Sequence, residues 1–243
     1  MKLTINVQPD EAAFDQLAAR RIYDQIAAKP DSVIGLSTGR TTGNMHRILA
    51  GMLQEKPLPL AGITFFGQDE ITGVPQAYWG ACYTMLRSDL MDALGIDAAH
   101  FLMLSTRTED YPASARAFPA ELEARGGIDL LILGLGENGH LGFNQPGTPF
   151  GSTTRVAPLA PELDARVRRD LNLDPGHGLG GATLGLQDVM HARRLILAAK
   201  GRHKAAIVKQ MLQGPVTEAV PASVLQLHPA CEFLLDADAA ALL

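Results

Sequence analysis

The chain has 243 residues, of which 47% are hydrophobic and 19% charged, and its formal net charge of −5 goes with a pI near 5.8. The negative charge argues against nucleic acid or an anionic membrane as the main partner. The apolar content suffices for one large core, and no long polar linker divides the chain. We therefore expect a single domain over residues 1–243.

Neither targeting signals nor disulfides are expected. The N-terminal segment MKLTINVQPDEAAF has no uninterrupted apolar run and no cleavage-site pattern, so we do not expect a signal peptide. No segment offers the ~20 apolar residues of a membrane span. Cys82 and Cys231 lie far apart, outside any CxxC spacing. We expect no structural zinc site, a cytoplasmic location, and a small buried hydrophobic role for each cysteine.

Strand and helix patterns alternate along the chain. Residues 10–28 have helical spacing with Asp10 as N-cap, and Pro30 ends this helix before a buried strand over 33–36. A turn over 37–43, called the 37–43 loop below, follows this strand. Further on we expect helices over 45–53 and 113–124, strands over 63–66, 101–104, 130–134, 194–199 and 233–235, and a loop over 174–181. Strands separated by helices indicate βαβ units and an α/β fold with a mostly parallel sheet.

Glycines and hydroxyl residues follow the strand over 33–36. In the segment LSTGRTTG they form a turn just before a helix, where aligned backbone N–H groups and the helix dipole suit a phosphate. The segment lacks the GxxxxGK[ST] spacing of a Walker loop, and it is not GxGxxG either. An ordinary turn of small residues is the alternative interpretation.

Two adjacent carboxylates, Asp69 and Glu70, follow the strand over 63–66. A carboxylate in a cleft can accept a proton from a carbon next to a carbonyl group. Neighbouring side chains in an extended chain point in opposite directions. We therefore expect one of the two to do chemistry and the other to hold the loop. A surface acidic pair is the alternative interpretation.

His140 follows the strand over 130–134, within the Gly-rich segment LGLGENGHLGFNQPGTP. In an open parallel sheet, ligands bind outside the carboxyl ends of the strands, and glycines let the backbone approach a ligand closely. A structural histidine is the alternative. An anion-binding loop, a carboxylate and a histidine at three strand ends together indicate a phosphorylated substrate and acid–base chemistry.

Five segments carry a resemblance to a known family. They are LSTGRTT at 36–42, TFFGQDEITGVP at 64–75, LGLGENGHLGFNQP at 133–146, GRHKA at 201–205 and ASVLQLHP at 222–229. With them the chain resembles the glucosamine-6-phosphate deaminase family, whose wider superfamily also contains the 6-phosphogluconolactonases. QDEITGVP, GFNQP and LQLHP are typical of the deaminase side. GLGENGHLGFNQPG, ATLGLQDVMHARRLIL and VPASVLQLHP are most similar to galactosamine-6-phosphate deaminase/isomerases.

The resemblance implies a modified doubly wound, Rossmann-like α/β fold with helices on both faces of the sheet. It also implies an aldose–ketose isomerisation of a 2-amino-2-deoxy-hexose 6-phosphate, coupled to loss of ammonia, with no cofactor and no metal. The implied partner is a small-molecule sugar phosphate, and a homo-oligomer is left open.

Residue roles follow from the same resemblance. Asp69 matches the carboxylate that shuttles a proton between C2 and C1, and His140 matches the histidine that helps to open the pyranose ring. The residues that match the 6-phosphate contacts are Thr38, Gly39, Arg40, Thr41, Lys204 and either Arg168 or Arg169. Without the resemblance, the basic clusters that contain Lys204 and these arginines are typical of solvated helix faces.

The chain departs from the family pattern beside His140. The Asp two residues before this histidine and the Glu five residues after it are replaced by Asn138 and Gln145. A nearby opposite charge raises a histidine pKa, so we expect His140 to be a weaker base here and more often neutral. Arg40 replaces a usual Gly and can grip an anion through two hydrogen bonds. Ala157 replaces a lysine used for allosteric activation in some members, so we expect no activation by an N-acetylated sugar phosphate.

Other functions stay open at this point. A 6-phosphogluconolactonase-type hydrolase would use His140 as general base on water. An isomerase of a non-amino 6-phosphosugar, or of a similarly anionic sugar, would release no ammonia. A non-catalytic sensor of sugar phosphates fits poorly with the retention of Asp69, His140 and Lys204. The sequence does not distinguish the galacto from the gluco epimer.

Overall fold

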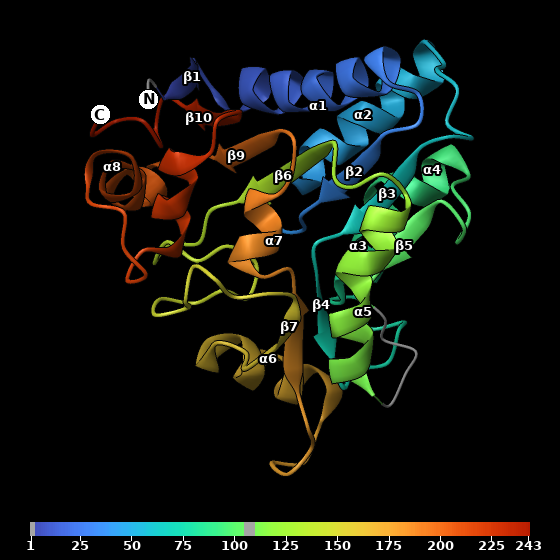
Figure 1. The fold of residues 1–243 in the computed structure, drawn as a ribbon, viewed down its shortest axis with the longest axis vertical. Helices are drawn as coiled ribbons and strands as arrows, with labels where there is room; N and C mark the ends of the chain where they lie inside the picture. Colours follow the sequence, from blue (N-terminus) through green and yellow to red (C-terminus); the bar gives the residue numbers. More distant parts are fainter. Residues whose placement is uncertain (1–2, 105–109) are drawn as a thin grey trace.

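Parallel strands form the main sheet of the protein. A computed structural model describes residues 3–104 and 110–243. Within these residues the main sheet has seven strands in the order β1-β10-β9-β6-β2-β3-β5, and every neighbouring pair is parallel (Figure 1). Their bounds are β1 Thr4–Gln8, β2 Val33–Leu36, β3 Thr64–Gly67, β5 Phe101–Met103, β6 Leu130–Gly134, β9 Leu195–Ala199 and β10 Cys231–Asp236. The α/β fold with a mostly parallel sheet is confirmed.

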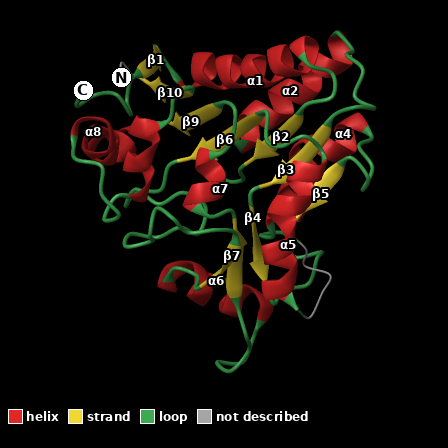
Figure 2. Cartoon of the chain, viewed as in Figure 1, coloured by secondary structure: helices red, strands yellow, loops and turns green. Residues whose placement is uncertain are grey.

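Helices cover both faces of this sheet (Figure 2). The helices of the described residues are α1 Glu11–Ala28, α2 Gly43–Glu55, α3 Cys82–Leu86, α4 Asp92–Leu94, α5 Tyr111–Ala124, α6 Pro161–Leu171, α7 Leu186–Met190 and α8 Ala205–Gln213. Of these, α6 packs on the second sheet described below and not on the main sheet. Further helical segments are the π-helical η1 Arg87–Met91 and the 3-10 segments η2 Arg202–Lys204 and η3 Pro221–Leu227. In the described part of the chain, no helix has the length and apolar character that a membrane span requires.

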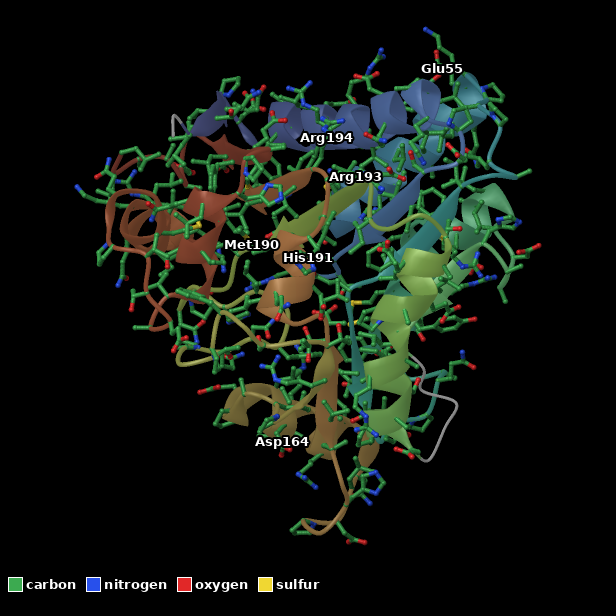
Figure 3. The ribbon with its side chains drawn as sticks, in the orientation of Figure 1. Glu55, Asp164, Met190, His191, Arg193 and Arg194 are labelled. Atoms are coloured by element: carbon green, nitrogen blue, oxygen red, sulfur yellow. The ribbon has the colours of Figure 1, made fainter. Side chains whose placement is uncertain are left out.

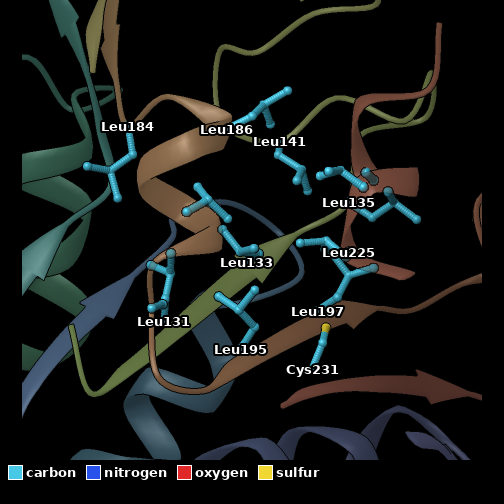
Figure 4. Close-up of a cluster of buried hydrophobic side chains, with 14 of the residues drawn as sticks. Leu131, Leu133, Leu135, Leu141, Leu184, Leu186, Leu195, Leu197, Leu225 and Cys231 are labelled. Atoms are coloured by element: carbon cyan, nitrogen blue, oxygen red, sulfur yellow. The ribbon is translucent and has the colours of Figure 1, made fainter. Parts of the chain in front are cut away.

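The apolar core of the main sheet divides into two clusters because its central strands are buried on both faces, and a third cluster packs α6 against the second sheet described below. Leu130 and Ile132 of β6 face the cluster under α1 and α2, whereas Leu131 and Leu133 face the cluster under α5, α7 and α8 (Figure 4). Successive side chains of a strand point to opposite faces, so a doubly covered strand reads as a continuous apolar run. This is why the sequence predicts β2, β3, β6 and β9 well.

A second, smaller sheet extends from one end of the main sheet. Its strands β4 Asp69–Thr72, β8 Gly180–Thr183 and β7 Arg155–Ala157 are antiparallel, in the order β4-β8-β7. The expected loop over 174–181 is wrong at its end, since β8 begins at Gly180. Glycine is a poor strand former, but β8 is paired on both edges. Gly181 also leaves room for Phe143, whose ring occupies the space that a Cβ at this position would need.

His46 is a buried polar side chain that costs folding free energy inside this core. It lies on α2, is 1% exposed, and neither ring nitrogen has a hydrogen-bond partner among the described residues. Burial, with a smaller contribution from the positive charge of Arg47, lowers the pKa of His46 to about 3. The folded protein therefore holds this ring neutral at pH values where the unfolded chain protonates it.

Replacing His46 by Met is expected to make the protein less sensitive to acid. A lowered folded-state pKa means that stability is lost as pH falls below 6.5, the usual histidine value, toward about 3. Relative to His46→Met, the wild-type free energy of unfolding should drop by about 1.4 kcal/mol per pH unit in this range. Urea unfolding of both proteins between pH 6 and pH 4 measures this difference, because the other titrating groups are common to both. Parallel curves would contradict it.

Candidate active site

A cleft of about 590 Å³ lies at the carboxyl ends of β2, β3 and β6. The 37–43 loop, the start of β4 and the loop that carries His140 all meet there. The lining residues that the sequence predicts are Thr38, Gly39, Arg40, Thr41, Asp69, Asn138, His140, Gln145 and Lys204. The structure therefore brings together side chains that three separate strand ends and η2 contribute.

The 37–43 loop is a tight turn that leads directly into α2. Gly39 has φ 115°, a conformation that favours glycine. Its carbonyl accepts the N–H groups of Thr42 and Gly43 at 3.2 and 3.0 Å, and the Thr42 hydroxyl donates to the carbonyl of Ser37 at 2.9 Å. Because α2 begins at Gly43, the positive end of its dipole adjoins the cleft.

Lys204 places a buried positive charge at the edge of the cleft. It is 8% exposed, and no carboxylate among the described residues lies within ion-pair distance of its ammonium group. Burial lowers the pKa of Lys204, whereas the negative charge of Glu137 opposes this and the positive charge of Arg40 adds to it. A buried charge without a partner is costly, so an anion in the cleft would relieve this cost.

The arginine that helix α6 contributes to the cleft is Arg166. The structure does not bring Arg168 and Arg169 into the described lining of the cleft. Arg168 instead donates to Asp164, labelled in Figure 3, with 2.6 Å between Nε and Oδ2, and to two backbone carbonyls. The resemblance to the family has poor register over this helix. Arg166, Arg168 and Arg169 point in different directions from α6, so the sequence does not identify the arginine that lines the cleft.

Asp69 is the first residue of β4, and its carboxylate is almost fully buried. Burial raises the pKa of Asp69 to about 6, and a hydrogen bond from Cys82 acts in the opposite direction. Gly142, with φ 55°, allows the His140 loop to pass close by, because a Cβ at this position would lie 3.2 Å from Oδ2 of Asp69. Asp69 is thus a carboxylate with a raised proton affinity, ionised at neutral pH, at a cleft wall.

Glu70 points away from the cleft and holds the chain. Its carboxylate is fully buried and accepts the backbone N–H groups of Ile71, Cys82 and Tyr83 at 2.7, 2.9 and 2.7 Å. Burial raises the pKa of Glu70 to about 7, against the effect of these three hydrogen bonds. The two neighbouring carboxylates therefore have different surroundings, and Glu70 ties β4 to the start of α3.

His140 is half-buried and is oriented by an amide. Its Nδ1 lies 2.6 Å from Oδ1 of Asn138, and Nδ2 of Asn138 donates to Oε1 of Gln145 at 3.1 Å. An amide oxygen only accepts hydrogen bonds, so Nδ1 carries the hydrogen and Nε2 keeps its lone pair. Burial first, then the positive charge of Lys204, lowers the pKa of His140, while Glu137 raises it. The site therefore favours a neutral imidazole that can accept a proton at Nε2.

Replacing Gln145 by Glu is expected to raise the pKa of His140. Gln145 reaches the imidazole through Asn138, so a carboxylate at 145 keeps the hydrogen bond to Asn138 and adds a negative charge. If the neutral histidine limits ring opening, turnover of a pyranose substrate should also rise in single-turnover experiments. If the amides instead suit a different substrate, activity on that substrate should fall.

NMR titration of His140 in the wild type, Gln145→Glu and Gln145→Met checks this prediction. The Met variant removes the hydrogen bond without adding charge, so it separates the two effects. A His140 pKa that is the same in Gln145→Glu and in the wild type would contradict the electrostatic argument.

Comparisons with known proteins fit this site. Residues 10–232 match the model of a family described as glucosamine-6-phosphate isomerases/6-phosphogluconolactonase, and the chain belongs to this family. Among the described residues, no group of three or more His, Cys, Asp or Glu side chains could hold a metal ion.

The chain is similar to several deaminases over nearly its full length. A protein named glucosamine-6-phosphate deaminase from Bifidobacterium longum (strain NCC 2705) is 34% identical over 97% of this chain and 91% of its own. One of the same name from Pseudarthrobacter chlorophenolicus is 36% identical over 94% of this chain and 88% of its own.

Solved structures show the same fold. A monomeric glucosamine-6-phosphate deaminase superposes with a TM-score of 0.91 at 29% identity and covers 99% of this chain and 100% of its own. A 6-phosphogluconolactonase from Trypanosoma brucei has a TM-score of 0.76 at 23% identity, with 99% and 98% coverage, and this likeness concerns the fold alone.

Proposed function

We propose that the protein is an aldose–ketose isomerase/deaminase. It converts a 2-amino-2-deoxy-hexose 6-phosphate, galactosamine- or glucosamine-6-phosphate, to a ketohexose 6-phosphate and ammonia. The observation that carries this proposal is the arrangement of one cleft, which is lined by a buried carboxylate, Asp69, by the 37–43 loop and by Lys204. No carboxylate among the described residues pairs with Lys204. The names of the full-length relatives support it.

The 6-phosphate is held by the 37–43 loop and by the positive charges around it. The loop supplies N–H and hydroxyl donors at the N-terminus of α2, and Lys204, Arg40 and Arg166 supply charge. Arg166 takes the role that the resemblance assigned to Arg168 or Arg169, because it is the arginine of α6 that lines the cleft.

His140 carries out ring opening, and Asp69 carries out the isomerisation. With Nδ1 bonded to Asn138, Nε2 of His140 accepts the proton of the anomeric hydroxyl and returns it to the ring oxygen as the C1–O bond to that oxygen breaks. Asp69 then takes the proton from C2 and delivers it to C1, while the C1 carbonyl oxygen gains a proton and the amine loses one. The resulting C2 imine adds water and loses ammonia, which leaves the ketose. Glu70 acts only by holding β4 and α3.

Replacing Asp69 by Asn is expected to abolish most turnover and to leave sugar-phosphate binding nearly intact. General acid–base groups contribute ~10²–10⁴-fold to rate, and an amide cannot take the C2 proton. In the wild type, kcat/KM should fall as pH drops below about 6, because the base must be ionised and burial raises the pKa of Asp69 to about 6.

Ammonia release and binding of a sugar phosphate, measured on Asp69→Asn and wild type, check this. Asp24→Asn is the matched control, since Asp24 is an exposed α1 carboxylate paired with Arg20. Near-normal turnover in Asp69→Asn would remove Asp69 from the mechanism.

Replacing Lys204 by Ala is expected to weaken binding of phosphorylated sugars in particular. Loss of a charge-assisted hydrogen bond costs about 1.5–3 kcal/mol, or roughly 10- to 100-fold in affinity. Calorimetry with the phosphorylated and unphosphorylated forms of one sugar measures the difference. Lys209→Ala, on the exposed side of α8, is the control. An equal loss of affinity for both sugars, or no loss, would show that Lys204 does not contact the phosphate.

Two further activities are tested in the same assay. A neutral His140 with a free Nε2 also suits a general base on water, as a lactonase would need. Ammonia release from both amino-sugar epimers, beside 6-phosphogluconolactone hydrolysis and isomerisation of a non-amino hexose 6-phosphate, distinguishes these reactions. We also propose a cytoplasmic location, because both cysteines are free thiols and a reducing compartment keeps thiols free.

A further inference from the structure

Cys82 lies in the cleft between two of its proposed functional parts. It is the first residue of α3 and is 4% exposed. Its Sγ lies 3.6 Å from Oδ1 of Asp69 and 3.3 Å from Oγ1 of Thr38 in the 37–43 loop. The carboxylate of Glu70 accepts its backbone N–H at 2.9 Å, which fixes the position of the sulfur. The sequence predicted only a small buried hydrophobic role, and the structure adds these polar contacts.

The direction of the two hydrogen bonds follows from the groups involved. An ionised carboxylate can only accept, so the thiol hydrogen points at Asp69, and the Thr38 hydroxyl donates to the sulfur. Burial, followed by the negative charges of Asp69 and Glu70, raises the pKa of the Cys82 thiol well above its usual value. The thiol therefore stays protonated at neutral pH and remains a donor.

Resting on the proposed function, we propose that Cys82 is a positioning residue whose thiol donates a hydrogen bond to Oδ1 of Asp69 and holds this carboxylate for proton transfer. With Oδ1 held, Oδ2 is the oxygen left to take the C2 proton. The thiol keeps its own hydrogen throughout, and the proton on Asp69 goes back to C1. A thiol is a weak donor, so it orients the base without removing most of its basicity.

Two substitutions at Cys82 should change the pKa of Asp69 in opposite directions. Cys82→Ala removes the donor, so the pKa of Asp69 should rise by about one pH unit. Cys82→Ser supplies a stronger donor, so the pKa of Asp69 should fall below its wild-type value. In Cys82→Ala, kcat should drop by about 10- to 100-fold with little change in KM, because the carboxylate loses its fixed orientation. In Cys82→Ser, kcat should recover in part.

The pKa of Asp69 depends on other groups that these variants leave unchanged. Glu70 is its neighbour on β4. The other titratable or charged side chains that line the cleft are Arg40, Glu137, His140, Glu162, Arg166 and Lys204. Cys231→Ala is the matched control, since this second buried cysteine lies in the core on β10 and outside the described lining of the cleft.

The experiment follows the aspartate carboxyl signals by ¹³C NMR titration of wild type, both Cys82 variants and Cys231→Ala, with Asp69→Asn for assignment. The pH profile of kcat/KM is measured beside it. Opposite displacement of the Asp69 pKa in the Ala and Ser variants, with none in Cys231→Ala, supports the proposal. An unchanged pKa, or displacement in the same direction in both, overturns it. The NMR titration needs no substrate, so it tests the hydrogen bond between Cys82 and Asp69 separately from the proposed function. Wild-type protein that is inactive on all amino-sugar phosphates would contradict the proposed function, and the pKa comparison between the variants would still decide the role of Cys82.

Discussion

A buried carboxylate at the start of β4 accepts three backbone N–H groups, and the shape of the cleft wall depends on it. Glu70 joins its own strand to the first turn of α3, so Asp69 and Cys82 are placed by the same group. An unpaired backbone N–H in a buried position is costly. The three N–H groups therefore favour the one arrangement of β4 and α3 in which Glu70 accepts all of them. The neighbouring residue, Asp69, is then free of any structural task and faces the cleft.

Burial shifts the ionisable groups of the cleft in a consistent way. It raises the pKa of Asp69 and lowers those of His140 and Lys204, so burial disfavours the charged form of each side chain. The raised pKa of Asp69, about 6, makes it a stronger base than an exposed aspartate, whereas the lowered pKa of His140 favours its neutral imidazole. Lys204 has no carboxylate partner among the described residues, so an anion bound in the cleft would supply the missing charge.

The sequence predicts the parts of this protein whose pattern reflects burial on two faces. The strands around residues 33–36 and 130–134 are continuous apolar runs, and the structure has them with little change. It does not predict β1, an edge strand in which Ile5 and Val7 remain exposed, or β8, whose sequence GGAT resembles a turn and depends on partners on both edges.

Site residues follow the same division. Asp69 and His140 both follow buried strands and both belong to the segments that carry the family resemblance. The structure places both in the cleft. The arginine of α6 could not be chosen between neighbours, because one residue along a helix turns the side chain by about 100°. Cys82 gave no signal at all, since its role depends on Thr38 and Asp69, which are distant in sequence.

The 37–43 loop belongs to the main sheet, whereas Asp69 belongs to the second sheet, and one residue connects the two. Gln68 donates its N–H to the carbonyl of Leu36 at 3.1 Å, and its own carbonyl accepts the N–H of Leu184 at 3.0 Å. This double attachment holds the 37–43 loop and Asp69 at a fixed separation. Backbone hydrogen bonds, and not side chains, therefore set the spacing between the two sides of the cleft, so substitutions of the side chains that line it leave this spacing in place.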